Sequence, residues 1–172
     1  MKTLVIHPED ITTKFLSIVY KDTNWTIIDY NVSKRQLKEN IKSHDRIIML
    51  GHGSEQGLFG YKRLVIHSNL VYLLRDKICY CVWCNADVFF NKYGLHGFCT
   101  GMIVSEIDEA EQFINYPYKE DDINKSNELF SINLKYYISN NKYTLNSFIN
   151  SYNSICNEII KYNRQNLYEK TN

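Results

Sequence analysis

The sequence predicts an α/β fold, a three-layer sandwich with a mostly parallel central sheet and additional helices towards the C-terminus. Residues 3–7, 25–30 and 45–50 are short apolar runs typical of buried strands, and the two segments between them carry helix patterns. Two strand–helix–strand passages in succession imply right-handed crossovers and therefore parallel strands. The 172 residues suit a single domain. Within it we expect an α/β core over residues 1–113 and a helical flank over 125–168.

The first crossover follows Pro8, where the first strand ends. Asp10, Thr12 and Thr13 are N-cap candidates for a helix over residues 15–22. The second crossover begins at Ser33, which forms a capping-box pattern with Gln36 and predicts a helix over 34–44.

The middle of the chain predicts a small hairpin or flap, then two further strands. Residues 57–67 contain two glycines and alternate weakly, which favours the hairpin. Ser68 caps a short predicted helix, and residues 78–84 read as the fourth strand. A fifth strand is expected near 98–107, and Asp108 opens a further helix over 109–114.

The C-terminal part of the chain differs from the rest in its residue pattern. Residues 119–127 read as an exposed loop, and helices are expected over 128–139 and 144–163. The last of these segments keeps a 3.6-residue apolar period that includes Ile155 and Cys156. We expect these helices to form a lid or a flank packed on the sheet.

Charge and cysteine usage narrow the functional classes. Twenty basic and nineteen acidic side chains give a net charge of +1, which argues against a globally basic nucleic-acid binder. The fourteen tyrosines do not interleave with basic residues, so nucleic acid is not an expected partner. Neither a signal peptide nor a membrane span is predicted, so we expect a cytoplasmic protein without a membrane partner. Five cysteines, an odd number, are then expected to be reduced thiols.

Polar and reactive side chains follow several of the predicted strands. These are His7, His52, Cys84 and the pair Ser105–Glu106. Because the carboxyl ends of parallel strands meet at one edge of a sheet, this edge is the expected functional site.

His52 and Cys84 are the most specific candidates at that edge. A nearby imidazole favours the thiolate of a cysteine and makes it a useful nucleophile. Gly51 and Gly53 flank His52, so the backbone can turn abruptly there, and the Gly53 N–H could face a developing oxyanion. The alternative is that Cys84 is a small buried hydrophobe and His52 an ordinary loop histidine.

A metal site is an alternative to this chemistry. Cys79, Cys81 and Cys84, followed by His96 and Cys99, are ligand types that zinc accepts. Cys79 and Cys81 point to one face of a strand that is expected to be buried on both faces, so a core position is the simpler interpretation. A Cys81–Cys84 redox pair is less favoured, since such motifs open a helix and this one closes a strand. We therefore predict neither a metal nor another cofactor.

The same residues resemble a known group of proteins. A strand followed by His-Gly, then a strand followed by Cys, is similar to the caspase–haemoglobinase (clan CD) cysteine peptidases, which include the CHAT domains. The matching blocks are HDRIIMLGHG (44–53), CYCVWCNAD (79–87) and GMIVSEIDEA (101–110). The GHG and WCNAD blocks also resemble those of small bacterial proteins of unassigned function. The resemblance covers roughly residues 3–113 and implies a caspase-like fold.

The resemblance implies roles for individual residues. His52 would be the general base or acid, Cys84 the nucleophile, and the Gly53 amide part of an oxyanion hole. Glu106 and Asp108 would shape the pocket for the residue before the scissile bond.

Asp87 is a third nearby carboxylate, and clustered negative charge would favour Arg or Lys in a peptide or protein substrate. The alternative is that Asp108 only caps a helix and that Glu106 faces solvent. His7 would help to bind substrate or orient His52, or would be a buried, satisfied histidine.

A second function from another class stays open. On the same fold, the strand-end crevice could hold a small anionic ligand such as a nucleotide without catalysis, in a role such as bacterial defence or counter-defence. This alternative gains if Lys14, Lys62 and Arg63 converge on the crevice.

Overall fold

A six-stranded sheet forms the centre of the molecule in a computed structural model that describes residues 1–114, 118–153 and 157–170. Its strands lie in the order β2-β1-β3-β7-β8-β9. The first five run parallel, and β9 is antiparallel to β8. The strands are β1 (Thr3–Ile6), β2 (Thr26–Ile28), β3 (Arg46–Leu50), β7 (Ile78–Val82), β8 (His96–Thr100) and β9 (Leu167–Lys170). The predicted α/β class with a mostly parallel sheet is thus confirmed.

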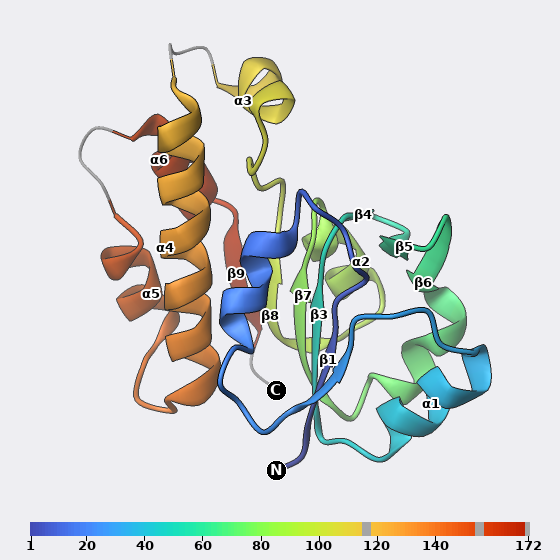
Figure 1. Cartoon of the computed structure of the whole chain (residues 1–172). Helices are drawn as coiled ribbons and strands as arrows, with labels where there is room; N and C mark the ends of the chain where they lie inside the picture. The colour runs from blue at the N-terminus through green and yellow to red at the C-terminus, as the bar shows by residue number, and fades with distance from the viewer. Residues whose placement is uncertain (115–117, 154–156, 171–172) are drawn as a thin grey trace.

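Both faces of the sheet are covered, which gives three layers (Figure 1). Side chains of β3 alternate between them: Ile47 and Met49 enter one apolar cluster, Ile48 and Leu50 the other. This two-sided burial explains why the central strands read as continuous apolar runs. The first cluster includes residues of α1 (Lys34–Lys42), η2 (Ser68–Leu73) and α2 (Ala86–Lys92). The second includes residues of η1 (Lys14–Val19), α4 (Glu120–Ser139), α5 (Leu145–Ser151) and α6 (Glu158–Arg164).

The predicted hairpin is a separate three-stranded antiparallel sheet. It consists of β4 (Gly53–Ser54), β5 (Gly57–Gly60) and β6 (Arg63–Ile66). Leu58 and Ile66 of this sheet are fully buried in the first apolar cluster, so it is anchored to the core.

Two of the predicted helices are short helices of the 3-10 type. They are η1 after β1 and η2 after β6. Both are only six residues long. Such short segments gain little from α-helical propagation, so tertiary packing selects the tighter turn.

The expectation of an exposed loop over residues 119–127 is wrong, because α4 already begins at Glu120. Three acidic residues occupy its first turn, where they interact favourably with the helix dipole. Asp122 accepts a hydrogen bond from the Lys119 N–H at 3.0 Å, and Ile123 is buried. Some polar side chains of this segment are buried or line a cleft, among them Ser126, Asn127 and Asn124.

The long helix expected over 144–163 is two helices, α5 and α6. Ile155 and Cys156, which belonged to the predicted apolar period, lie outside the described residues. Strand β9 was not predicted, since only Leu167 of its four residues is buried and the segment carries no strand pattern.

The C-terminal helices do pack on the sheet. Phe148 of α5 is fully buried and stacks on Phe98 of β8, with ring centroids 5.8 Å apart. The last helix of the core, α3 (Ile107–Phe113), lies beyond the carboxyl edge of the sheet (Figure 1). None of the described helices is long and apolar enough to cross a membrane.

Candidate active site

His52 and Cys84 line the same small cavity at the carboxyl edge of the sheet. His52 follows β3, and Cys84 follows the neighbouring strand β7. The cavity has a volume of about 30 Å³, and Phe15, Ile103 and Ser105 are also among the residues that line it. The two strand-end groups expected to meet therefore border one space.

The chain reaches His52 through a tight turn. Gly51 adopts a φ of +139°, a region that side chains rarely occupy, and its N–H bonds to the Val82 carbonyl at 3.1 Å. Gly53 then starts β4 against the ring of Trp83, where an added Cβ would lie 2.2 Å from Trp83 Cδ1. Both glycines of the Gly-His-Gly block are required by the backbone path.

Cys84 occupies the turn between β7 and α2. The residue after it, Asn85, is left-handed at φ +61°, and the Ala86 N–H bonds back to the Trp83 carbonyl at 3.2 Å. Trp83 is buried and donates its indole N–H to the Ser54 carbonyl at 2.9 Å, which ties this turn to the flap. The turn brings the Cys84 side chain to the end of the strand, partly buried.

The thiol of Cys84 is protonated in this arrangement. Among the described residues its hydrogen-bond partners are the Ile103 carbonyl at 3.7 Å and Glu109 Oε1 at 3.8 Å. Burial, followed by the negative charge of Glu109, raises the pKa of the Cys84 thiol from 9.0 to about 12. No direct hydrogen bond joins this sulfur to the His52 ring.

His52 is bound instead to the loop that follows β1. Its Nε2 lies 2.6 Å from Thr12 Oγ1, 3.6 Å from Glu106 Oε1 and 3.8 Å from Asp10 Oδ1. The ring is about one-third exposed, with 36% of its side-chain surface accessible. The environment of Nε2 is therefore rich in hydrogen-bond acceptors.

The segment between β8 and α3 and the first turn of α3 carry the two glutamates: Glu106 is the N-cap of α3, and Glu109 lies in its first turn. Glu109 Oε2 accepts from the Ser105 and Glu106 N–H groups at 2.8 and 3.2 Å, so its carboxylate is fixed beside the thiol. The buried Asn163 of α6 holds the same loop by bonding the N–H and the carbonyl of Val104, both at 2.8 Å. The C-terminal helices thus position this wall of the site.

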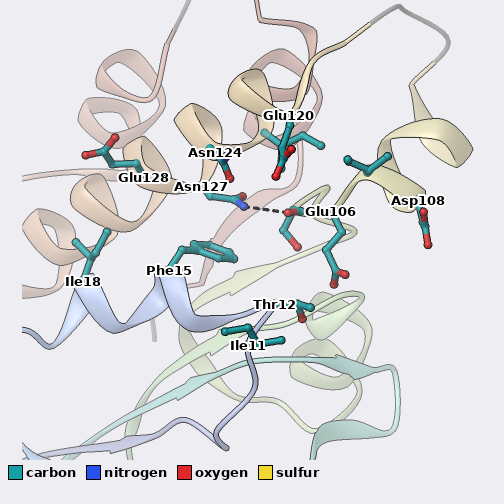
Figure 2. A pocket seen from close by; sticks show the side chains of 13 residues that line it. Ile11, Thr12, Phe15, Ile18, Glu106, Asp108, Glu120, Asn124, Asn127 and Glu128 are labelled. Carbon is teal, nitrogen blue, oxygen red and sulfur yellow. Dashed lines mark hydrogen bonds between the residues drawn. The ribbon is translucent and has the colours of Figure 1, made fainter.

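A larger cleft of about 590 Å³ opens next to the cavity (Figure 2). Phe15 and Ser105 line both spaces and form the boundary between them. Figure 2 shows Glu120 and Asn124 of α4 facing Ile11 and Thr12 of the opposite wall. The lining contains four carboxylates and, among the described residues, no cationic side chain; the carboxylates are Glu106, Asp108, Glu120 and Glu128.

The remaining predicted site residues are distributed unevenly. Asp108 lines the cleft together with Glu106. Asp87 lies in the first turn of α2. Burial, followed by the negative charge of Asp87, raises the pKa of Cys99 and of Tyr168, which places Asp87 towards β8 and β9. It is absent from the described lining of the cleft.

His7 is buried and lines a different space from those that His52 lines. It contacts Tyr20 Oη at 3.0 Å and Thr13 Oγ1 at 3.2 Å. Desolvation lowers the pKa of His7 from 6.5 to about 4, so the ring is neutral near pH 7. Its contacts are those of a satisfied core histidine.

The cations named for an anionic ligand line other cavities. Lys62 and Arg63 border a space of about 420 Å³ that also contains Glu9, Asp10 and His52. Lys14 lines a third space of about 380 Å³, which contains Asp29.

The candidate metal ligands do not gather into a site. Cys79, Cys81 and Cys99 are buried in the apolar cluster beneath α1 and α2. Within the described ranges no group of three or more His, Cys, Asp or Glu side chains could hold a metal ion.

Three residues at the site were not singled out for chemistry from the sequence. The sequence predicts Asp10 and Thr12 only as helix caps, and Glu109 only as part of a helix. The Glu-x-x-Glu spacing of Glu106 and Glu109 at a helix start was the available signal for Glu109. Comparisons of the chain with protein-family models, with curated proteins and with solved structures give no match.

Proposed function

We propose that this protein is a caspase-like cysteine hydrolase, a peptidase that uses Cys84 as nucleophile and His52 as general acid and base. The observation that carries the proposal is the single cavity that both residues line at the carboxyl edge of the sheet. The mostly parallel sheet and the strand-end position of each group support it as well.

The chemistry would proceed through a thioester. His52 takes the proton of the Cys84 thiol while the sulfur attacks the carbonyl carbon of the scissile bond. The amine leaves with the proton from His52, and the acyl group stays on sulfur. Water, deprotonated by His52, then releases the carboxylic acid and restores the thiol. The Gly53 N–H is the proposed donor to the oxyanion of each tetrahedral intermediate.

The resting site must open before this reaction. The cavity of about 30 Å³ matches one water molecule and is too small for a scissile carbonyl and its flanking groups. Phe15 and Ser105 separate it from the cleft. Substrate entry therefore requires that Phe15 or the segment carrying Ser105 move, and a movement of Ser105 would also disturb the Glu109 carboxylate that it bonds.

The cleft supports a substrate with a basic side chain. Its volume of about 590 Å³ is within the usual range for ligand pockets. Glu106 and Asp108, at the start of α3, line the cleft, and Glu120 of α4 adds a third carboxylate. An Arg or Lys before the scissile bond would pair with these charges.

The anionic-ligand alternative has less support. Lys14 lines one space and the Lys62–Arg63 pair another, and acidic side chains line both. An anion in the acidic cleft would be repelled.

Hydrolysis of short fluorogenic peptides tests the proposal. The set carries Arg, Lys, Leu or Asp before the scissile bond. We expect hydrolysis of the Arg and Lys peptides, its loss in Cys84→Ala and His52→Gln, and a rise in KM of up to about 5-fold in Glu106→Gln, the effect of one exposed ion pair.

Cys99→Ala is the matched control, because Cys99 is a buried cysteine of the apolar core. It should retain the activity of the wild type. The proposal fails if no peptide of the set is cleaved, or if cleavage survives in Cys84→Ala.

A further inference from the structure

Three side chains from two loops form a chain of hydrogen bonds that ends on His52. Thr12 contributes both its backbone N–H and its hydroxyl to Asp10 Oδ1, each at 2.9 Å. The same hydroxyl oxygen lies 2.6 Å from Nε2 of His52. The Asp10–Thr12 turn follows β1 and His52 follows β3, so the sheet holds the two loops side by side.

Counting protons fixes the direction of each bond. A threonine hydroxyl has one hydrogen, and a carboxylate can only accept. The two bonds of Asp10 to Thr12 lower the pKa of the Asp10 carboxyl, so Asp10 is ionised and takes the hydroxyl hydrogen. The Thr12 oxygen must then accept from His52, which requires a hydrogen on Nε2.

The surroundings of the ring agree with this assignment. Within the described residues, the ionised groups paired with Nε2 are Glu106 Oε1 at 3.6 Å and Asp10 Oδ1 at 3.8 Å, and both are acceptors. A bare nitrogen at Nε2 would face three oxygens and would be repelled by two carboxylates.

We infer that Asp10 and Thr12 are positioning residues that hold His52 in its Nε2–H tautomer and leave Nδ1 as the basic nitrogen of the ring. The inference deepens the proposed function, since it identifies Nδ1 as the atom that receives the Cys84 proton. When Nδ1 takes that proton the ring becomes an imidazolium, and the positive charge lies beside Asp10 and Glu106. The Thr12 hydroxyl links the Asp10 carboxylate to the ring by hydrogen bonds, and the Asp10 charge also lies 3.8 Å from Nε2.

Nitrogen-15 NMR of the histidine side chains tests the inference without any substrate. The ring nitrogens of the wild type are observed at about pH 8.5, where ordinary histidine is neutral. The His52 signals are assigned by their absence in His52→Gln. We expect the Nε2–H tautomer in the wild type and in Thr12→Ser, which keeps the hydroxyl. In Thr12→Val, which keeps the shape without the hydroxyl, and in Asp10→Asn, we expect a mixture of both tautomers.

The matched control is Thr26→Val. Thr26 Oγ1 lies 2.9 Å from Nε2 of His44. The variant therefore removes the hydroxyl that contacts His44, a histidine outside the site. It should change the signals of His44 and leave those of His52 unchanged.

An Nδ1–H tautomer in the wild type overturns the inference, as does a His52 tautomer that Thr12→Val leaves unchanged. If the tautomer behaves as expected and no peptide is cleaved, the proposed function fails while the hydrogen-bonded chain stands. If peptides are cleaved, Thr12→Val should lower kcat with little change in KM, and Thr12→Ser should restore kcat.

Discussion

The reactivity of the Cys84 thiol is the property that this site controls most directly. Burial and the Glu109 carboxylate raise the pKa of Cys84 from 9.0 to about 12. At pH 8 the thiolate fraction then falls from about one-tenth to about one in ten thousand, a loss of about 1,000-fold. A more basic sulfur is also the better nucleophile, which returns a factor of about 20 over three pKa units. We therefore expect Cys84 to react with iodoacetamide about 50-fold more slowly than an unperturbed thiol.

Glu109→Gln should reverse part of this effect. The substitution keeps an oxygen for the Ser105 and Glu106 amides and turns an N–H₂ group towards the sulfur, where it favours the thiolate. A unit charge about 4 Å away is worth at most about 4 kcal/mol at a dielectric constant of 20, and solvent near the partly buried loop reduces it. We expect the pKa of the Cys84 thiol to fall by about one to two units in Glu109→Gln. The rate at which iodoacetamide alkylates Cys84 should then rise about 3- to 10-fold.

The assay is the time course of iodoacetamide labelling at pH 8, followed by intact mass and by peptide mapping of the cysteines. Glu111→Gln is the matched control, because Glu111 is an exposed glutamate of the same helix α3. It should label at the wild-type rate. The reasoning is refuted if wild-type Cys84 reacts as fast as a small free thiol, or if Glu109→Gln and Glu111→Gln label equally fast.

Three further predictions concern stability, each measured by urea unfolding. Asn163→Ala leaves the buried N–H and carbonyl of Val104 without partners and should cost about 3 kcal/mol, and an effect below about 1 kcal/mol would contradict this role. Phe148→Ala removes a fully buried ring of the second apolar cluster and should cost about 3–5 kcal/mol; a neutral effect would mean that α5 does not pack on the sheet. For His7, whose pKa is lowered from 6.5 to about 4, the unfolded chain binds a proton that the folded chain excludes, so stability is lost as the pH falls. Between pH 7.5 and 5 the wild type should lose about 2 kcal/mol more than His7→Gln, and equal losses would be inconsistent with a buried neutral ring.

The sequence was sufficient for the centre of the fold. Parallel strands buried on both faces leave continuous apolar runs such as residues 46–50, and these runs are visible without coordinates. The Gly-His-Gly block was equally informative, since Gly51 needs its positive φ and Gly53 has no room for a Cβ. The ends of β3 and β7 follow from these patterns, and so does the shared edge at which His52 and Cys84 lie.

The sequence was insufficient wherever stability comes from contacts between distant segments. Only one residue of β9 is buried, so the segment has no local strand pattern in the sequence. The strand forms by pairing with β8, the edge strand of the parallel set, which is a contact between distant segments. The polar start of α4 resembled a loop, because the residues that bury it come from other parts of the chain.

For the site, residue types and order along the chain determined which groups could act and at which edge of the sheet. The protonation state of the Cys84 thiol and the tautomer of the His52 ring depend on the tertiary structure. Glu109 reaches the Cys84 sulfur from the first turn of α3, and Thr12 reaches the His52 ring from the loop after β1; both are distant in sequence from the groups they contact. The physical reason is that a pKa or a tautomer depends on charges and donors within a few ångströms. Those neighbours are set by how the loops pack, and packing is a property of the whole folded chain.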